Sequence, residues 1–178
     1  TLEIERRAGV SRGARIHHYP TKASLLADAV DHLYLQLSAH YEEAFGRVPG
    51  GAEAPVERDA DRLRTGLMLL WSVYRQRSYT AVLELNMAAR TDAELRARLI
   101  EVGNHHRRLA VQAATDYFAL PAQSALRLVE AIHAVLMGLL MQRNVECDEQ
   151  RERDVIEALQ DMVIPHLPGK TSSQPPSA

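Results

Sequence analysis

Apolar side chains recur along this chain at intervals of three and four residues, and no segment alternates apolar and polar residues as a strand does. This spacing predicts helices throughout and therefore an all-α fold. Glycine, proline and capping residues divide the pattern into eight predicted helices, at about 1–8, 12–19, 22–45, 57–77, 79–90, 92–118, 122–143 and 148–165. The stretch 46–55 is rich in glycine and proline and is predicted to be a loop.

Four helix starts are predicted from side chains that can accept a hydrogen bond from an amide of the first helical turn. These N-cap residues are Ser11, Thr21, Thr91 and Asp148. Thr91 is followed three residues later by Glu94, which is the spacing of a capping box.

Composition restricts the class of protein. The 178 residues can form one large core, or a small module joined to a larger one, and 46% hydrophobic with 25% charged residues is typical of a soluble globular chain. No apolar run approaches the roughly 18 residues of a membrane span, and no signal peptide is recognisable. The single Cys147 cannot form an internal disulfide and fits a reducing compartment, so we expect a cytoplasmic protein without a membrane partner.

Charge is distributed unevenly along the chain. Residues 1–22 hold five basic and two acidic side chains, a net charge of +3, whereas the whole chain carries −2, which leaves −5 on the remainder. A small basic end on an acidic body is typical of a compact DNA-binding module joined to a domain that does not touch DNA. The N-terminal segment is therefore the candidate for contact with nucleic acid.

The basic segment has the layout of a helix-turn-helix. Gly9 is predicted to end the first helix, and glycine permits the positive φ that the sharp turn into Ser11 needs. Ile4, Ala8 and Val10 are expected to pack the two short helices together.

The first half of the second helix is then left free to enter a major groove. Arg12 and Arg15 can form bidentate hydrogen bonds to guanine or bind phosphate, and Gly13 lets the backbone approach DNA closely. A purely structural helical hairpin would not favour a helix-destabilising glycine beside two arginines.

Residues 1–26 closely resemble the helix-turn-helix of the TetR family of bacterial transcription regulators. Ahead of a long helix, the match runs through Ala8-Gly9-Val10-Ser11-Arg12-Gly13, His17-His18-Tyr19 and Pro20-Thr21-Lys22. Over the rest of the chain, only the number, length and order of the predicted helices are similar to the family.

The resemblance implies roles for individual positions. It implies base contacts from Arg12, Gly13 and His17, and phosphate contacts from Thr1, His18 and Lys22. Ser11 and Arg15, which lie in the half of the second helix left free for the groove, are also expected to contact DNA. Ile16 stands where many members of the family have a phosphate-binding tyrosine, and the neighbouring Arg15 could supply the contact that isoleucine cannot.

The family also carries a helix ahead of the position of Thr1, and we expect this chain to lack it. The small core around Ile4, Val10, Tyr19 and Leu25 would then be open on one side, and the chain as written is expected to bind DNA poorly.

The resemblance divides the chain into three parts, a partial helix-turn-helix domain with its connecting helix at 1–43, a ligand-binding and dimerisation domain at 44–166 and a disordered tail at 167–178. It implies a ligand-responsive transcription regulator, expected to be a repressor that a small inducer releases from a pseudo-palindromic operator on double-stranded DNA. The sequence does not distinguish repression from activation.

Two C-terminal helices carry more apolar surface than one intramolecular face can bury. They are predicted to pair with their two-fold mates in a homodimeric four-helix bundle, through about 122–143 and 148–164.

An inducer pocket needs apolar walls with a few placed polar groups. The predicted lining residues are Leu67, Met68, Trp71, Tyr74, Leu83, Asn86, Met87, His106, His133 and Met137. Methionines give adaptable walls, so an apolar or aromatic ligand is expected, with Asn86 or His106 fixing its polar end and no metal or cofactor. Trp71 also fits a core position, and His106 and His133 also fit satisfied core or interface histidines.

Signatures of other protein classes are weak. The adjacent pairs 17–18 and 105–106 place histidines on different helix faces, and no HExxH or CxxC metal motif occurs. No phosphate-binding glycine loop, nucleophile elbow or clear carboxylate pair indicates an enzyme. The alternative that stays open is a helical protein-interaction or dimerisation module without a small-molecule ligand, which a tightly packed body would favour.

Overall fold

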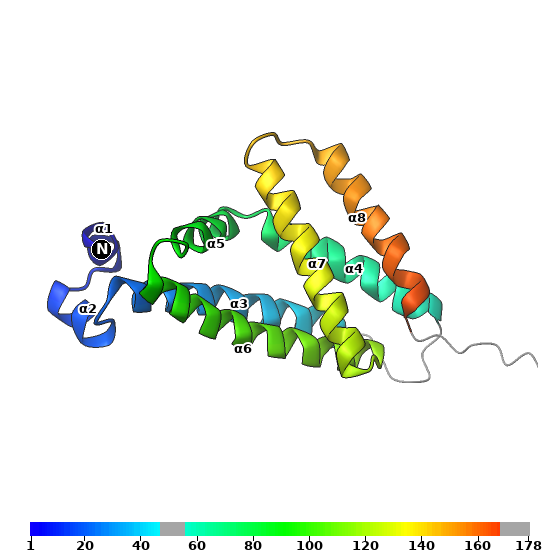
Figure 1. Ribbon diagram of the computed structural model, residues 1–178, viewed down its shortest axis with the longest axis horizontal. Coiled ribbons are helices and arrows are strands. Elements are labelled where there is room, and N and C mark those ends of the chain that lie inside the picture. The colour runs from blue at the N-terminus through cyan, green and yellow to red at the C-terminus, as the bar shows by residue number, and fades with distance from the viewer. Residues whose placement is uncertain (47–55, 168–178) are drawn as a thin grey trace, which may run out of the picture.

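The computed structural model describes residues 1–46 and 56–167. Within those residues the chain forms eight α-helices, a short 3-10 helix and no strand, so the predicted all-α class is confirmed (Figure 1). The elements are α1 (Leu2–Ala8), α2 (Arg12–His18), α3 (Lys22–Gly46), α4 (Val56–Tyr74), α5 (Arg77–Ala88), α6 (Ala93–Phe118), α7 (Ala122–Arg143), α8 (Glu149–Val163) and η1 (Ile164–His166). The bounds of the α-helices differ from those predicted by at most three residues.

Three of the predicted N-caps form. Ser11 Oγ accepts a hydrogen bond from the amide of Ala14 at 3.1 Å, and Asp148 accepts bonds from two first-turn amides of α8. Thr21 and Ser24 cap the start of α3 reciprocally, because each side-chain oxygen accepts a bond from the other residue's amide, at 3.0 and 3.3 Å. Each cap satisfies amides that have no partner inside the helix.

The N-cap of α6 lies one residue later than predicted. Asp92 has extended backbone, with φ −117°, and its carboxylate accepts a hydrogen bond from the amide of Leu95 at 2.9 Å. Thr91 was the wrong choice because it remains bonded to the preceding helix. Its amide and its hydroxyl both donate to the carbonyl of Ala88, at 3.1 and 3.3 Å.

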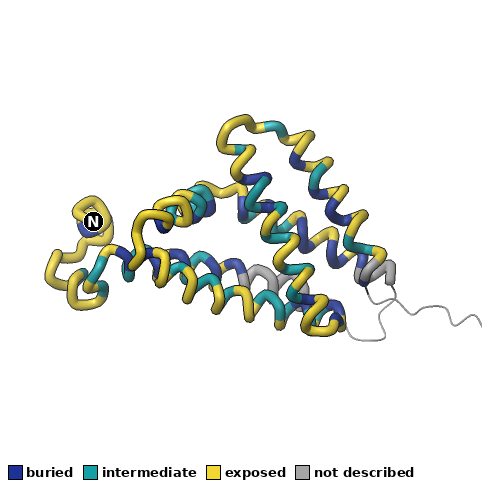
Figure 2. The backbone as a smooth tube through the Cα atoms, viewed as in Figure 1, coloured by how far each residue is buried: buried dark blue, intermediate teal, exposed yellow. Residues whose placement is uncertain are grey.

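The long helices α3 and α6 lie side by side, with α1 and α2 at one end of the pair (Figure 1). α7 packs on α6 and continues into α8, which runs back beside it, and α4 packs against α3, α7 and α8. The buried residues face the spaces between these helices (Figure 2). We call α4–α8, together with η1, Leu167 and the part of α3 that packs on them, the body.

A second, smaller cluster lies at the start of α3. Ala23 is buried there against Ala89, at the end of α5, and Leu95, in the first turn of α6. This cluster fixes the point at which α3 leaves the body toward α1 and α2.

The pair α1 and α2, called the head, has almost no apolar core. Glu5 is the only buried residue in these two fully described helices, whereas Ile4 and Val10 are 45% and 44% exposed. The expectation that Ile4, Ala8 and Val10 pack the helices together was wrong, since all three are exposed. Gly9 does end α1, with the predicted left-handed backbone at φ 65°.

Helix α7 corrects the expectation about apolar runs. It is long and apolar enough, by length and composition alone, to cross a membrane, with a mean hydropathy of 1.6 over its most apolar window. Only 22% of that window is buried within the chain, although Leu136, Leu139 and Leu140 belong to the core. Most of the other apolar residues of α7 are partly buried, whereas Ala122, Ala131, Ala134 and Met141 are exposed.

The predicted loop and tail fall mostly outside the described residues, which exclude 47–55 and 168–178. Leu167, at the expected start of the tail, is instead 6% exposed and packs in the main core. The body therefore extends one residue beyond the predicted limit of 166.

Candidate functional site

The turn of the head is held by a buried ion pair between α1 and α2. Arg15 Nε lies 2.6 Å from Glu5 Oε1, and the two side chains are 12% and 8% exposed. The Arg15 guanidinium also donates to the carbonyl of Tyr19 at 3.2 Å. Arg15 was predicted to contact DNA, but in this arrangement its guanidinium pairs with Glu5 and joins the two helices. A local pattern could not reveal this, because Glu5 and Arg15 lie ten residues apart.

The remaining predicted DNA contacts are on the surface. The exposed residues of this set are Thr1, Ser11, Arg12, Gly13, His17, His18 and Lys22. A Cβ added to Gly13 would meet only Ser11 Oγ, at 3.8 Å, so nothing in the chain covers the backbone at that point. With Ser11 occupied as the N-cap, the exposed basic and imidazole side chains of this set are Arg12, His17, His18 and Lys22.

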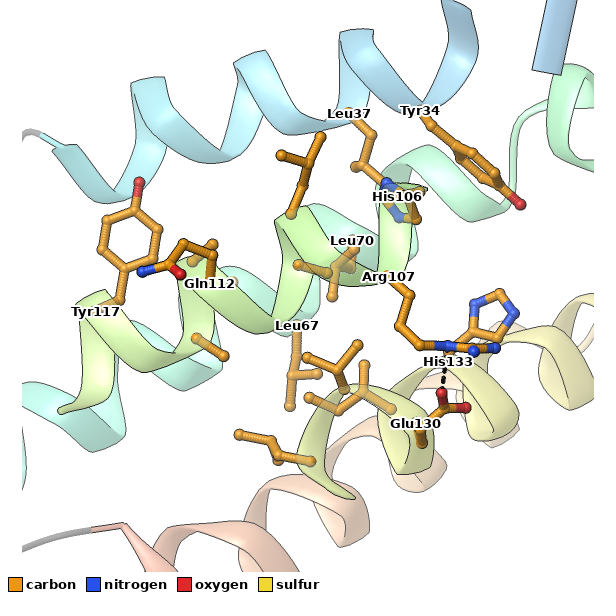
Figure 3. A pocket seen from close by; sticks show the side chains of 18 of the residues that line it. Tyr34, Leu37, Leu67, Leu70, His106, Arg107, Gln112, Tyr117, Glu130 and His133 are labelled. Carbon is orange, nitrogen blue, oxygen red and sulfur yellow. Dashed lines mark ion pairs between the residues drawn. The ribbon is translucent and has the colours of Figure 1, made fainter. Parts of the chain in front are cut away.

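The body encloses a cavity of about 460 Å³ between α3, α4, α6 and α7 (Figure 3). Its walls are mainly apolar, with Leu67 and Leu70 from α4 facing Leu128, Val129 and Ile132 from α7. This volume lies within the range of roughly 300–1,000 Å³ that is common for small-molecule sites.

The cavity exists because small residues occupy the inner face of α6. Gly103, Ala110, Ala113 and Ala114 recur at helical spacing along that face, opposite Gly66 of α4. Leucine at these positions would fill much of the space between α4, α6 and α7. The row of small residues on α6 therefore accounts for the empty space.

Two histidines and three tyrosines form a polar–aromatic group along one side of the cavity. The Tyr74 hydroxyl and His133 Nδ1 are hydrogen-bonded at 2.8 Å. His106 stacks on Tyr34, with ring centroids 4.2 Å apart and an interplanar angle of 14°. Tyr79 stacks on Tyr74 from the side of α5, with centroids 4.4 Å apart.

Burial makes the charged forms of these groups unfavourable. Burial, with smaller contributions from nearby His133 and His105, lowers the pKa of His106 from 6.5 to about 4. Burial also lowers the pKa of His133, although Glu130 opposes the shift. Burial raises the pKa values of Tyr34, Tyr74 and Tyr79. The site is therefore uncharged at neutral pH along this side.

Charged groups lie only at the edge of the cavity. Arg107 Nε and Glu130 Oε1 are 2.5 Å apart and link α6 to α7, with the two side chains 49% and 47% exposed (Figure 3). The Gln112 amide donates to Asp116 at 2.9 Å on the same stretch of α6. The exposed residues where α6 meets α7 indicate that the cavity opens to solvent between these two helices.

Four of the ten predicted pocket residues line this cavity, namely Leu67, Tyr74, His106 and His133. The other six do not. Met68, Asn86 and Met87 are exposed, and Leu83 and Met137 pack against the core from elsewhere. The helical face toward the cavity could not be chosen from α4 and α5 alone, since both carry apolar residues on more than one side.

Trp71 occupies the core position that the sequence left open as an alternative. It is 4% exposed, and its Nε1 donates to Glu152 Oε2 at 3.1 Å, which joins α4 to α8. Glu152 is also paired with Arg143 of α7, so its buried carboxylate is satisfied from two helices.

Sequence reasoning missed the part of the lining that comes from α3 and the outer turns of α6, including Tyr34, Arg107 and Tyr117. The signal that could have found α6 is the small-residue stripe, interrupted only by His106 and Arg107. No comparable signal marks Tyr34.

Among the described residues, no three His, Cys, Asp or Glu side chains are grouped closely enough to hold a metal ion, and Cys147 is exposed. No protein-family model, characterised protein or solved structure matches this chain.

Proposed function

We propose that this protein is a ligand-responsive transcription regulator that reads double-stranded DNA with α2 and binds a small apolar inducer in the body cavity. The observation that carries the proposal is the course of α3, which begins at the head and forms one wall of the cavity. Lys22 opens the helix beside the exposed face of α2, and Tyr34 and Leu37 line the cavity. One rigid element thus touches both sites.

The coupling between the two sites follows from helix geometry. Residues 22 to 37 of α3 span about 22 Å at 1.5 Å per residue. A ligand that separates α3 from α6 would also move the cluster of Ala23, Ala89 and Leu95, which holds the start of α3. Ligand and operator would then favour different orientations of the head, which is a coupling free energy between two sites.

The cavity also bears on the alternative of a helical interaction module without a ligand. That alternative favours a tightly packed body, whereas about 460 Å³ of mainly apolar space remains between four helices. A cavity of this size with mainly apolar walls is typical of a small-molecule site. The cavity therefore supports a ligand-binding body.

The proposal includes a homodimer formed through α7 and α8. Met141 and Met162 are 58% and 61% exposed, and most of the apolar window of α7 is not buried in the chain. Ala131, Ala134 and Gly138 lie on the face of α7 opposite its core residues, where side chains are small enough for close helix approach. A two-fold dimer would place two α2 helices about 34–36 Å apart, or a multiple of that spacing, on a pseudo-palindromic site.

DNA recognition is tested with the full-length protein, by selecting a binding site from random duplexes and then comparing variants on that site. We expect Arg12→Ala to weaken binding by about 1–3 kcal/mol and to relax sequence choice. Lys22→Ala should weaken all sequences alike and make the salt dependence shallower by about one unit. Arg98→Ala, which removes an exposed charge from α6, is the matched control and should leave affinity unchanged.

Unchanged operator affinity in both Arg12→Ala and Lys22→Ala would contradict a DNA-reading role for the head.

Dimerisation is tested separately by light scattering at micromolar concentration. We expect a dimer that Gly138→Lys converts to a monomer without unfolding it, because a Cβ at Gly138 would meet no described atom within 4 Å apart from its chain neighbours and its own helix backbone. A monomeric wild-type protein would contradict the dimer.

A further inference from the structure

His106 is the polar group of the cavity wall for which the described residues provide no hydrogen bond. Its Nδ1 is buried and has no hydrogen-bond partner. The rest of the side chain forms no hydrogen bond with a described residue either. The ring is nevertheless held in place, since it stacks on Tyr34 with the two planes 14° apart. Its counterpart His133 differs in this respect, because its Nδ1 is bonded to the Tyr74 hydroxyl.

The geometry leaves one nitrogen of His106 for a ligand. Nδ1 is enclosed by protein, whereas Nε2 is accessible and forms no hydrogen bond with a described residue. His106 lies on the cavity-lining face of α6, between Gly103 and Ala110 (Figure 3). Because both flanking residues are small, a molecule in the cavity can approach the ring edge closely.

We infer that the cavity takes a neutral, mainly apolar ligand bearing a hydroxyl group that hydrogen-bonds Nε2 of His106, an inference that deepens the proposed function and rests on it. A hydroxyl suits this position because it donates to an unprotonated Nε2 and accepts from a protonated one, so it satisfies either neutral tautomer. The apolar part lies against Leu67, Leu70, Val129 and Ile132. Burial of that part provides the larger share of the affinity.

The charges around the cavity argue against an ionic ligand. Its lining contains one permanent cation, Arg107, which already pairs with Glu130, and a second carboxylate, Asp116. A ligand carboxylate would meet an excess of negative charge at the mouth. A ligand cation would lose its hydration among the aliphatic walls, where burial already disfavours the charged form of His106.

The test uses four probes with the same two-ring skeleton, titrated by calorimetry at neutral pH. They are 2-naphthol, naphthalene, 2-naphthoate and 1-methylquinolinium, which differ in carrying a hydroxyl, no polar group, a negative charge and a positive charge. We expect 2-naphthol to bind tightest, by about tenfold over naphthalene, which is the effect of one hydrogen bond to a buried group. Tightest binding by either ion, or no binding of 2-naphthol, would overturn the inference.

Variants assign the preference to one nitrogen. His106→Phe keeps a flat ring against Tyr34 and should abolish the advantage of 2-naphthol over naphthalene. His106→Gln, whose amide can reach the position of Nε2, should restore part of that advantage. His105→Phe makes the same substitution at the neighbouring exposed histidine and should change nothing. A hydroxyl preference that survives in His106→Phe would refute the role of His106.

The location is tested with Ala113→Leu, which adds volume to the inner face of α6. We expect binding of every probe to be lost, and retained binding of 2-naphthol would place the ligand elsewhere and overturn the inference. These titrations contain no DNA. A failure to find an operator would therefore count against the proposed function while leaving the ligand assignment intact. Failed titrations would overturn the ligand assignment while leaving the DNA-reading role intact.

Discussion

The head and the body are stabilised by different forces, although α3 joins them. In the head, one buried ion pair, one left-handed glycine and one side-chain cap hold two short helices with little apolar burial. In the body, aliphatic and aromatic side chains from α3–α8 form a single large cluster around a cavity. The head is therefore a module whose local stability depends on charge and caps, whereas the body depends on packing.

The largest expected effect on only one of the two regions comes from removing the carboxylate of Glu5. Glu5→Ala leaves the Arg15 guanidinium buried without its partner, which is expected to destabilise the head by about 3–5 kcal/mol. Hydrogen exchange should show lost protection of the α1 and α2 amides, with protection of α6 and α7 unchanged. Glu3→Ala is the control, since Glu3 pairs with Arg6 and Arg7 at the surface and its loss should have little effect. Equal loss of protection in head and body would contradict their independence.

Acid should act on the body through its buried histidines. Since the pKa of His106 falls from 6.5 to about 4 on folding, the unfolded chain binds its proton more readily. Stability from this group is complete above pH 6.5 and is lost as the pH falls toward about 4, by up to about 3 kcal/mol. The lowered pKa of His133 acts in the same direction.

Denaturant unfolding of the body, followed by Trp71 fluorescence at several pH values, measures this loss. His106→Phe should flatten the dependence of unfolding free energy on pH between 6.5 and 4, and His105→Phe should change it much less, because His105 is a minor cause of the lowered pKa of His106. A steep dependence that persists in His106→Phe would show that another group carries the acid sensitivity.

The smallest expected effects come from the same kind of cap in the two regions. Ser11→Ala and Asp148→Ala each remove a side-chain acceptor from first-turn amides and should cost about 1 kcal/mol. In the head, the cost should appear only as faster exchange of the α2 amides. In the body, it should lower the thermal unfolding temperature, because α8 contributes Ile156 and Leu159 to the main core. A lowered unfolding temperature of the body in Ser11→Ala would indicate that head and body unfold together.

Several features of this protein were determined by sequence alone because they depend on neighbours along the chain. The helix bounds follow from apolar spacing and from caps such as Ser11 and Asp148, whose hydrogen bonds span two or three residues. The positive φ of Gly9 likewise follows from a local turn. Where two adjacent residues competed for one cap, as Thr91 and Asp92 did, the local pattern did not distinguish them.

Tertiary structure decided which of several possible faces each helix turns inward. Arg15 could have pointed outward from α2, but Glu5 on α1 draws it into the turn. Trp71 and His106 were both predicted pocket residues with a core position as the alternative, yet one bonds to Glu152 across the core and the other lines the cavity. These outcomes depend on contacts between residues distant in sequence. The free energies of those contacts are set by the packing of whole helices, and the local spacing of residues does not encode that packing.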